Sequence, residues 1–305
     1  MNEAGVVVDT SGARSAPQTN SSARLRLLTR ADVPFADSLR ALAGWNQTTA
    51  DWERFLATEP DGCFLAECDG APAGTATTTV YGPELAWIGM LLVHPDYRRR
   101  GLGRALLLRC LEYLRGRGVR CIKLDATPAG RTVYPGLGFQ DEWTLRRWVG
   151  RRAAPPPAPP AAGLRPWRAG DASLVASLDA AAFGVCRQRL LAALAPQSLA
   201  GLVVESEPGR LAGYGFLRPG SQRLYLGPVV AATDETGLCL VRDLLARTES
   251  QTVLWDIPDP NAAAVCWAEA NGFVVQRPLT RMFLGENAAP GNPRQQFALA
   301  GPEVG

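Results

Sequence analysis

Residues 91–104 read LLVHPDYRRRGLGR, and this stretch decides how the chain around it folds. The apolar run from Leu85 to Val93 predicts a buried strand, which stops at a His-Pro-Asp triplet. Three arginines and the pair Gly101 and Gly103 then lead into a helical pattern. Glycines let the backbone turn tightly, and the free N–H groups of a first helical turn point at one spot with the helix dipole behind them. We therefore predict an anion site at this turn, suited to a phosphate.

The helix that follows is expected from Leu102 to about Arg115, with charged residues on one side and apolar residues on the other. Positive charge around the anion would come from Arg98, Arg99, Arg100 and Arg104. The spacing is not a dinucleotide fingerprint, because Leu106 stands where that motif needs a third glycine, and it lacks the Gly-Lys-Ser/Thr of a P-loop. A solvated turn is the alternative interpretation.

Composition narrows the class of protein. The 305 residues carry a net charge of only +3, which gives no reason to expect nucleic-acid or membrane binding. One histidine and seven scattered cysteines without a Cys-x-x-Cys pair predict no metal site and reduced thiols. No signal peptide or membrane-spanning run is recognisable, so a cytoplasmic location is expected.

A proline-rich segment divides the chain. Five of the six residues from Pro155 to Pro160 are prolines, which cannot join the interior of a helix or sheet. We predict a tail at 1–23, a domain at 24–150, a linker at 151–163, a second domain at 164–298 and a tail at 299–305. A long surface loop within one domain is the alternative to a linker.

Both flanks show the same order of elements, which favours an α/β fold with a mixed sheet, present twice. In the first half, strands are expected at 24–29, 63–68, 73–81, 85–93, 119–127 and 139–148, and helices at 31–43, 48–58 and 102–115. In the second half, strands are expected at 164–167, 202–205, 213–217, 223–230 and 252–256, and helices at 171–183, 188–195, 236–247 and 261–270.

A second motif lies downstream of the opening stretch. Val93-x4-Arg98-x-x-Gly101-x-Gly103 is followed by a helix, a strand and then Val-Tyr134-x-x-x-Gly-Phe139. Over residues 24–150 this arrangement resembles the GCN5-related N-acetyltransferase family. The resemblance implies two adjacent strands that splay apart, with acetyl-CoA as co-substrate in the cleft between them.

The resemblance also implies roles for individual residues. The backbone of Leu91, Leu92 and Val93 would bind the pantetheine, and the Leu91 amide would receive the thioester oxygen. The pyrophosphate would lie on the turn that runs through Arg99, Arg100, Gly101, Leu102, Gly103 and Arg104, with Arg98 beside it. Tyr134 would protonate the departing thiolate, and the loop residues Thr127, Gly130 and Arg131 would complete the cofactor site.

Some positions depart from the family pattern. Thr127 stands where many members have Asn, Gly130 where they have Ala, and Trp87 where histone-modifying members carry a glutamate base. The general base is therefore open, with Glu84 and Asp125 as candidates and a water relay as the alternative. The acceptor site is expected to involve Trp45, Asn46, Trp52, Tyr81 and Trp87, which could equally be core aromatics and connector residues.

The second half has the spacing of the family's last helix in Asn261-x-x-Ala264-x-x-Trp267-Ala268-x-x-x-Gly272-Phe273. Its tyrosine position is Ala268, which has no proton to donate. Asp234 and Glu235 stand where a pyrophosphate would lie, and carboxylates there repel it. We predict a degenerate copy that shapes the acceptor pocket of the first half.

These patterns together predict transfer of acetyl from acetyl-CoA to a primary amine, by direct attack and with a small-molecule acceptor. A homodimer is compatible with this interpretation. A protein or peptide acetyltransferase, and a CoA-binding regulatory module without turnover, are the alternatives.

Overall fold

The computed structural model describes residues 23–151, 162–248 and 251–305. In the first half the strands are β1 (Ala23–Leu27), β2 (Cys63–Cys68), β3 (Ala71–Val80), β4 (Leu85–Val93), β5 (Cys121–Ala126) and β6 (Gln140–Gly150). The helices of this half are α1 (Val33–Leu42), α2 (Thr49–Thr58), α3 (Leu102–Gly116) and the short α4 (Pro128–Arg131).

The second half repeats this order. Its strands are β7 (Leu164–Pro166), β8 (Ala200–Glu207), β9 (Arg210–Arg218), β10 (Leu224–Ala231), β11 (Val253–Pro258), β12 (Val274–Gly285) and β13 (Gln296–Ala298). Its helices are α5 (Ala172–Phe183), α6 (Gln188–Leu194), α7 (Asp234–Leu245) and α8 (Ala262–Ala270). The expected elements are confirmed with small shifts of their ends, whereas β12 and β13 were not expected.

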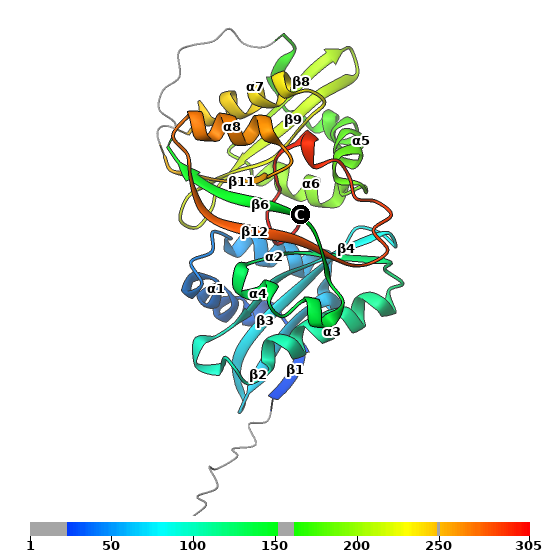
Figure 1. Ribbon diagram of the computed structural model, residues 1–305, viewed down its shortest axis with the longest axis vertical. Helices are drawn as coiled ribbons and strands as arrows, with labels where there is room; N and C mark the ends of the chain where they lie inside the picture. Colours follow the sequence, from blue (N-terminus) through cyan, green and yellow to red (C-terminus); the bar gives the residue numbers. More distant parts are fainter. Residues whose placement is uncertain (1–22, 152–161, 249–250) are drawn as a thin grey trace, which may run out of the picture.

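The strands of both halves form one sheet in the order β1-β2-β3-β4-β5-β12-β6-β11-β10-β9-β8-β7, with β13 paired to β10. The two halves exchange their long late strands, because β12 lies between β5 and β6 while β6 lies between β12 and β11. Figure 1 shows β6 and β12 running side by side across the middle of the molecule, between the two halves.

Two buried ion pairs join the exchanged strands to their neighbours. Arg281 of β12 lies directly opposite Asp125 of β5, and its Nε and Nη2 donate to the two carboxylate oxygens at 2.9 Å each. Arg147 of β6 lies opposite Asp256 of β11 in the same way, at 2.8 and 2.6 Å. Each bidentate pair therefore holds the strand of one half in the register that the other half requires.

Another pair of matching contacts indicates that the halves are copies of one fold. Arg26 of β1 bonds to Asp32 and to Glu67 of β2. In the second half, Arg165 of β7 bonds in the same way to Asp171 and to Glu205 of β8. The repeated order predicted from the sequence is thus present in three dimensions as well.

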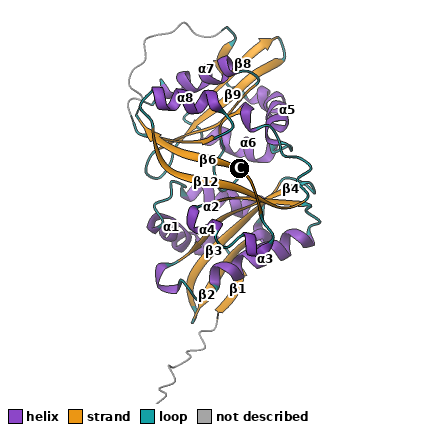
Figure 2. Cartoon of the chain, viewed as in Figure 1, coloured by secondary structure: helices purple, strands orange, loops and turns teal. Residues whose placement is uncertain are grey.

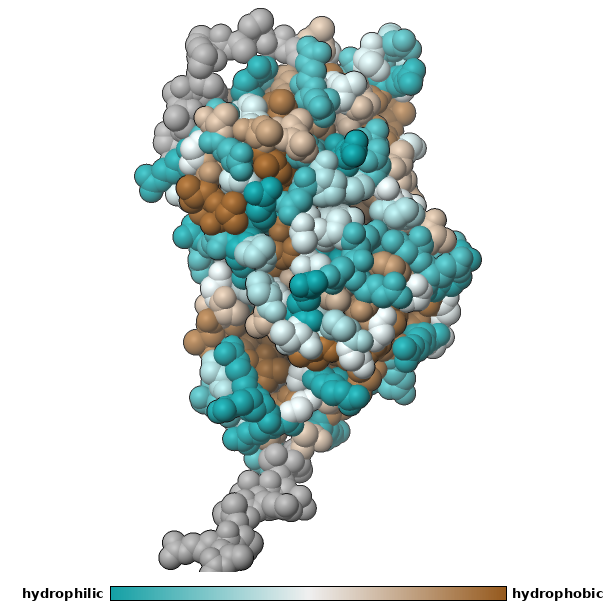
Figure 3. All heavy atoms as spheres, in the orientation of Figure 1, coloured by the Kyte–Doolittle hydropathy of each residue, from teal (hydrophilic) through white to brown (hydrophobic). Residues whose placement is uncertain are grey.

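Helices cover both faces of the sheet (Figure 2). In the first half, α3 packs through Leu106, Leu107 and other apolar residues on the face that carries Phe64 and Ile88. The face that carries Leu65 and Met90 packs against apolar residues of α1 and α2. Figure 3 shows polar residues over much of one side of the molecule, with apolar residues grouped between them. Of the described helices, none is long and apolar enough to cross a membrane.

The tails and the linker expected from the sequence can be compared with the structure only in part. Residues 1–22 of the expected tail and 152–161 of the expected linker lie outside the described residues. The segment 299–305, expected as a tail, instead runs through the interior, where Leu299, Ala300 and Val304 are fully buried. Its own apolar side chains and its contacts with the first half explain this difference.

Removing one partner of an exchanged-strand ion pair should destabilise the protein strongly. We expect Asp256→Ala to lower the free energy of unfolding by about 3–5 kcal/mol, because it leaves the Arg147 guanidinium buried without a counter-charge. Urea unfolding measures the loss. The double variant Arg147→Met/Asp256→Leu should recover most of it, and the exposed Glu112→Ala should stay within about 0.5 kcal/mol of wild type. Equal effects of Asp256→Ala and Glu112→Ala would contradict this role.

Candidate active site

The cleft of the first half opens where β4 and β5 separate. The two parallel strands pair only from Leu85 opposite Cys121 to Trp87 opposite Lys123, although β4 continues for six more residues. Beyond Trp87 the strands diverge and leave a V-shaped space. The splayed strands predicted from the family resemblance are therefore present.

A β-bulge shapes the β4 side of this cleft. The register with β3 passes from Gly89 opposite Thr77 to Leu92 opposite Thr75, so that Met90 and Leu91 share one partner position. Met90 has a φ of 49°, and its carbonyl accepts a hydrogen bond from Thr75 Oγ1 at 2.9 Å. The bulge re-aims the backbone at Leu91 toward the cleft, where a carbonyl oxygen of a ligand could bind an N–H group.

The turn before α3 has the form expected of an anion cradle. Gly101 caps the helix with a φ of 80°, and Arg99 also has a positive φ of 63°. The first intrahelical bond runs from the Ala105 amide to the Gly101 carbonyl, so the amides of residues 102–104 remain free of helical partners. Those amides and the helix dipole favour a bound phosphate group.

The four arginines of the turn do not act alike. Arg98 and Arg104 line the cavity described below, and Arg98 Nε also donates to the Val93 carbonyl at 3.2 Å. Arg100 instead stacks over the Tyr97 ring and donates to the Asp96 carbonyl, and Arg99 is exposed outside the cavity lining. The side chains of Leu92 and Leu102 are buried away from the cleft.

One cavity of about 410 Å³ runs from this turn along the cleft and past the β4 bulge. Its lining near the turn and the cleft comprises Leu91, Val93, Arg98, Gly103, Arg104, Leu107, Leu124, Thr127, Ala129, Gly130, Val133 and Tyr134. Its far end is lined by Trp45, Gln47, Gly89, Met90, Asp125, Arg147, Arg277, Leu279, Pro302 and Glu303. The glycine–arginine turn and a polar end are thus connected by an apolar passage.

Tyr134 also lines this cavity. Thr127 caps α4 by accepting a hydrogen bond from the Gly130 amide at 3.2 Å, which fixes the loop that carries the tyrosine. A Cβ atom at Gly130 would lie 3.2 Å from the Tyr134 ring, so glycine leaves room for it. Burial raises the pKa of Tyr134 to about 12, with Cys110 adding to the effect. The phenol is therefore protonated at neutral pH and able to donate.

Neither carboxylate proposed as the base from sequence is free to serve. Glu84 is absent from the cavity lining, and its side chain is 42% exposed and pairs with Arg120 at 3.6 Å. Asp125 reaches the cavity wall, but Arg281 occupies both of its oxygens. Burial raises the pKa of Asp125 and the Arg281 guanidinium opposes that effect. Both assignments therefore need correction: Glu84 lies outside the cavity, and the Arg281 contact of Asp125 could not be foreseen because the sequence did not place β12 beside β5.

Only some of the residues expected to bind the acceptor line the cavity. Trp45 lines the cavity, whereas Trp52 is fully buried in the core. Arg131, which was expected in the cofactor site, pairs with Asp141 on the exterior. Tyr81 donates its hydroxyl to the Val304 carbonyl at 2.6 Å, and Trp87 donates its ring N–H to the Pro302 carbonyl at 2.9 Å. These two residues hold the C-terminal segment in place and do not line the cavity.

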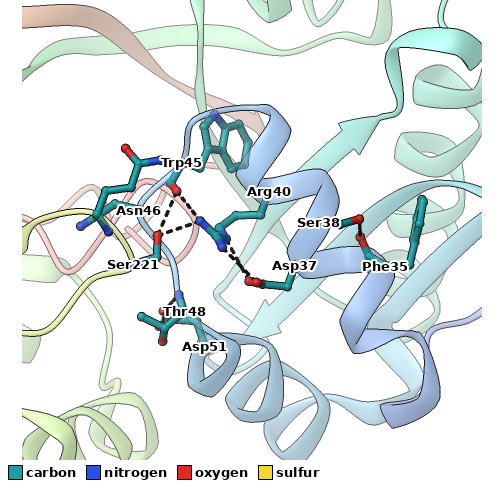
Figure 4. A network of polar contacts seen from close by, with 10 residues as sticks. Phe35, Asp37, Ser38, Arg40, Trp45, Asn46, Thr48, Asp51 and Ser221 are labelled. Carbon is teal, nitrogen blue, oxygen red and sulfur yellow. Dashed lines mark hydrogen bonds and ion pairs between the residues drawn. The ribbon is translucent and has the colours of Figure 1, made fainter.

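Asn46 joins the two halves. Its side-chain oxygen accepts from the amides of Gln222 and Arg223, and its amide donates to the Arg223 carbonyl. Figure 4 shows the neighbouring contacts, in which Arg40 donates to both the Trp45 carbonyl and Ser221 Oγ. Asn46 thus positions Trp45 rather than reaching the cavity itself.

Glu303 is a site residue that the sequence did not indicate. It is 6% exposed at the far end of the cavity, and its Oε2 accepts a hydrogen bond from Gln47 Nε2 at 2.7 Å. A Cβ atom at Gly89 would lie 2.4 Å from the Glu303 carbonyl oxygen, so only glycine lets the segment approach β4. Burial raises the pKa of Glu303, the negative charge of Asp51 adds to this, and Arg218 and Arg54 oppose it.

The second half has the same splayed pair of strands, but its cleft is filled. β10 and β11 pair from Leu224 to Leu226, and beyond this β13 lies against β10 with Ala298 opposite Val229. Phe297 packs so closely on α7 that a Cβ atom at Gly237 would lie 2.3 Å from its ring. Asp234 and Glu235 form the first turn of α7, where the first half has its phosphate turn. The protein's own chain therefore occupies the second cleft.

Two protein-family models match this chain. The Acetyltransferase (GNAT) family matches residues 33–139, and the Acetyltransferase (GNAT) domain matches residues 175–298. Together they span well over half of the chain, with one match in each half. The chain belongs to the GNAT acetyltransferases, a family of acyl-CoA-dependent N-acetyltransferases, and carries two GNAT folds in tandem. The family and fold predicted from the sequence are confirmed.

Individual relatives agree with this assignment. The uncharacterized N-acetyltransferase YitH of Bacillus subtilis is 27% identical over 179 residues, which is 59% of this chain and 62% of the relative. A mycothiol acetyltransferase of Salinispora arenicola is 29% identical over 235 residues, covering 67% of this chain and 75% of the relative. The [ribosomal protein bS18]-alanine N-acetyltransferase of Escherichia coli K12 is 40% identical over 87 residues, which is 28% of this chain and 57% of the relative.

Among solved structures, a candidate acetyltransferase from Pyrococcus horikoshii has a TM-score of 0.79 at 23% identity. The alignment covers 97% of this chain and all of the other. The likeness therefore extends over both halves of the fold. Within the described residues no cluster of three or more His, Cys, Asp and Glu is placed to hold a metal ion.

The filled second cleft determines how much acetyl-CoA the protein should bind. We expect one molecule per chain in titration calorimetry, because β13 occupies the second site. Arg98→Gln should weaken binding by about tenfold through loss of a charge-assisted contact. Arg100→Gln, a matched change outside the cavity lining, should have a much smaller effect. Two molecules per chain, or equal effects of the two variants, would contradict this prediction.

Proposed function

We propose that this protein transfers the acetyl group of acetyl-CoA to the primary amine of a small molecule, by direct attack with both substrates bound. The observation that carries the proposal is the cavity that connects the turn at Arg98 and Gly103 to the polar end at Gln47 and Glu303, with Tyr134 also in its lining. In this proposal residues 24–150 bind acetyl-CoA and supply the acid Tyr134, residues 164–298 complete the acceptor site, and Glu303 of the C-terminal segment supplies the base.

Residues of the first half suit acetyl-CoA. The free amides of residues 102–104, together with Arg98 and Arg104, would hold the pyrophosphate. The backbone of Leu91–Val93 would bind the pantetheine in the manner of an added strand. The co-substrate supplies an activated thioester, and the Leu91 amide would stabilise the negative charge that develops on its carbonyl oxygen.

The reaction needs one residue to accept a proton and another to donate one. Glu303 accepts a proton from the attacking amine while the new C–N bond forms. Tyr134 donates its phenolic proton to the departing sulfur as the C–S bond breaks. Exchange of both protons with solvent restores the starting state. A base whose pKa is raised toward neutral suits this task, since it accepts a proton more readily at working pH.

The walls of the polar end favour a small acceptor. They come from the α1–α2 loop (Trp45, Gln47), from both exchanged strands (Arg147, Arg277, Leu279) and from Pro302 and Glu303. An acceptor at this end would be surrounded by elements of both halves, whereas a peptide usually requires an open groove. Names among the relatives include acetyltransferases of mycothiol and of a ribosomal protein, so the protein acceptor is retained as the alternative.

A panel of amines tests this proposal. We expect CoA release with small primary amines and little with peptides that carry a free N-terminus. Tyr134→Phe should reduce kcat by roughly 10²–10⁴, the range for loss of a general acid, while acetyl-CoA binding persists. Turnover with peptides alone would favour a protein acceptor. Tight acetyl-CoA binding without turnover would favour a regulatory module, and unchanged turnover in Tyr134→Phe would refute the assignment of the acid.

A pH profile tests Glu303. Only its ionised form accepts a proton, so the activity of wild type should rise with pH through a pKa that burial places above the ordinary glutamate value. Glu303→Gln should lose this limb and about 10² in kcat/KM. A carboxyl group whose pKa is raised in the folded state stabilises the protein at low pH, and this stabilisation is lost as pH rises. Glu303→Gln should therefore be no less stable than wild type at pH 8. Glu84→Gln is the matched control and should retain the wild-type profile; loss of the limb there instead would contradict the assignment.

A further inference from the structure

The polar end of the cavity contains two buried atoms whose hydrogen-bonding capacity is unused. Gln47 donates through Nε2 to Glu303, but its Oε1 has no hydrogen-bond partner among the described residues. Arg277 Nε is likewise buried without a partner within the described chain. Because buried polar atoms are normally paired, an unpaired acceptor and an unpaired donor in one cavity indicate a ligand with the complementary groups.

Of Gln47 and Arg277, the arginine is the more unusual, because it carries a charge. No described carboxylate or carbonyl forms an ion pair or hydrogen bond with it, and its recorded partner is the Trp45 ring, 6.0 Å from the guanidinium carbon. Burial lowers the pKa of Arg277 to about 10, and nearby Arg147 adds to this effect. The Arg277 side chain is only half-buried, but a cation without a counter-ion in a cavity lining still favours a functional role.

The other charges at this end do not neutralise Arg277. Arg147 is already paired with Asp256 through a bidentate contact. Glu303 is held by Gln47 and forms no ion pair with Arg277. The polar end therefore presents a negative group at Glu303 and a positive group at Arg277, which is the complement of a molecule that carries both charges.

We propose that the acceptor is a small aminocarboxylate, whose amine faces Glu303 and Gln47 Oε1 while its carboxylate accepts hydrogen bonds from Arg277. This inference rests on the proposed function, because it names the substrate class of the same site. Arg277 is a specificity-determining residue in this arrangement and takes no part in the proton transfers. It comes from β12 of the second half, which gives the degenerate half a direct share in recognising the acceptor.

The experiment compares amines that differ only in charge. The probes are glycine, β-alanine, 4-aminobutyrate and 5-aminovalerate, each paired with its carboxamide, which keeps the size and hydrogen-bonding groups but lacks the negative charge. CoA release gives kcat/KM for each member. With wild type, we expect at least one carboxylate to exceed its carboxamide by roughly 10- to 100-fold, the range for a hydrogen bond to a charged group.

Variants then test whether Arg277 is responsible for that preference. Arg277→Gln should reduce the carboxylate-to-carboxamide ratio by roughly 10- to 100-fold, and Arg277→Lys should retain part of it. Arg115→Gln, an equivalent change on the exposed side of α3, should leave the ratio unchanged. Thermal unfolding should find Arg277→Gln at least as stable as wild type, since a half-buried charge without a counter-ion is removed. If Arg277→Gln unfolds, the ratio measured in Arg277→Lys decides.

The outcomes separate the two proposals. Carboxamides acetylated as well as or better than carboxylates, or a ratio that does not depend on Arg277, would overturn the aminocarboxylate inference and leave amine acetylation standing. No CoA release with any amine of the wider panel would overturn the proposed function, and this inference with it.

Discussion

The architecture depends on two buried arginine–aspartate pairs, Arg281 with Asp125 and Arg147 with Asp256. Each pair lies between a strand of one half and a strand of the other, and each carboxylate has both oxygens bonded. Burying these charges is costly unless the geometry is right, so the pairs penalise any register in which they would be separated. Exchange of β6 and β12 is therefore coupled to correct folding of both halves.

The exchange determines what surrounds the candidate active site. Because β12 lies beside β5, Arg277 and Leu279 of the second half line the cavity of the first. Because Asp125 is bonded to Arg281, a carboxylate that appeared available in the sequence has a structural role. The second half is thus more than an inactive copy: its strand forms part of the wall of the other copy's site.

The C-terminal segment links the two clefts. β13 fills the cleft of the second half, where Trp255 donates to the Phe297 carbonyl at 2.7 Å. The chain then crosses to the first half, where Tyr81 and Trp87 bond to its backbone and Glu303 enters the cavity. Gly237, Gly227 and Gly89 are among the positions at which the absence of a Cβ atom permits this course. Filling of the second cleft and delivery of a carboxylate to the cavity of the first half are therefore consequences of one path of the chain.

The sequence by itself determined the features that depend on neighbouring residues. The strand at 85–93, the glycine turn at 101–103 and the family motif at Tyr134 all follow from local pattern and spacing, and the duplicated order of elements follows from their repetition. Only the tertiary structure identified the candidate general base, showed that Asp125 has a structural role, and placed Arg277 in the cavity lining. Glu303 and Gln47 are 256 residues apart, and no local preference specifies such a contact. Those pairings arise from strand exchange and long-range packing, whose energies depend on which strands become neighbours in space.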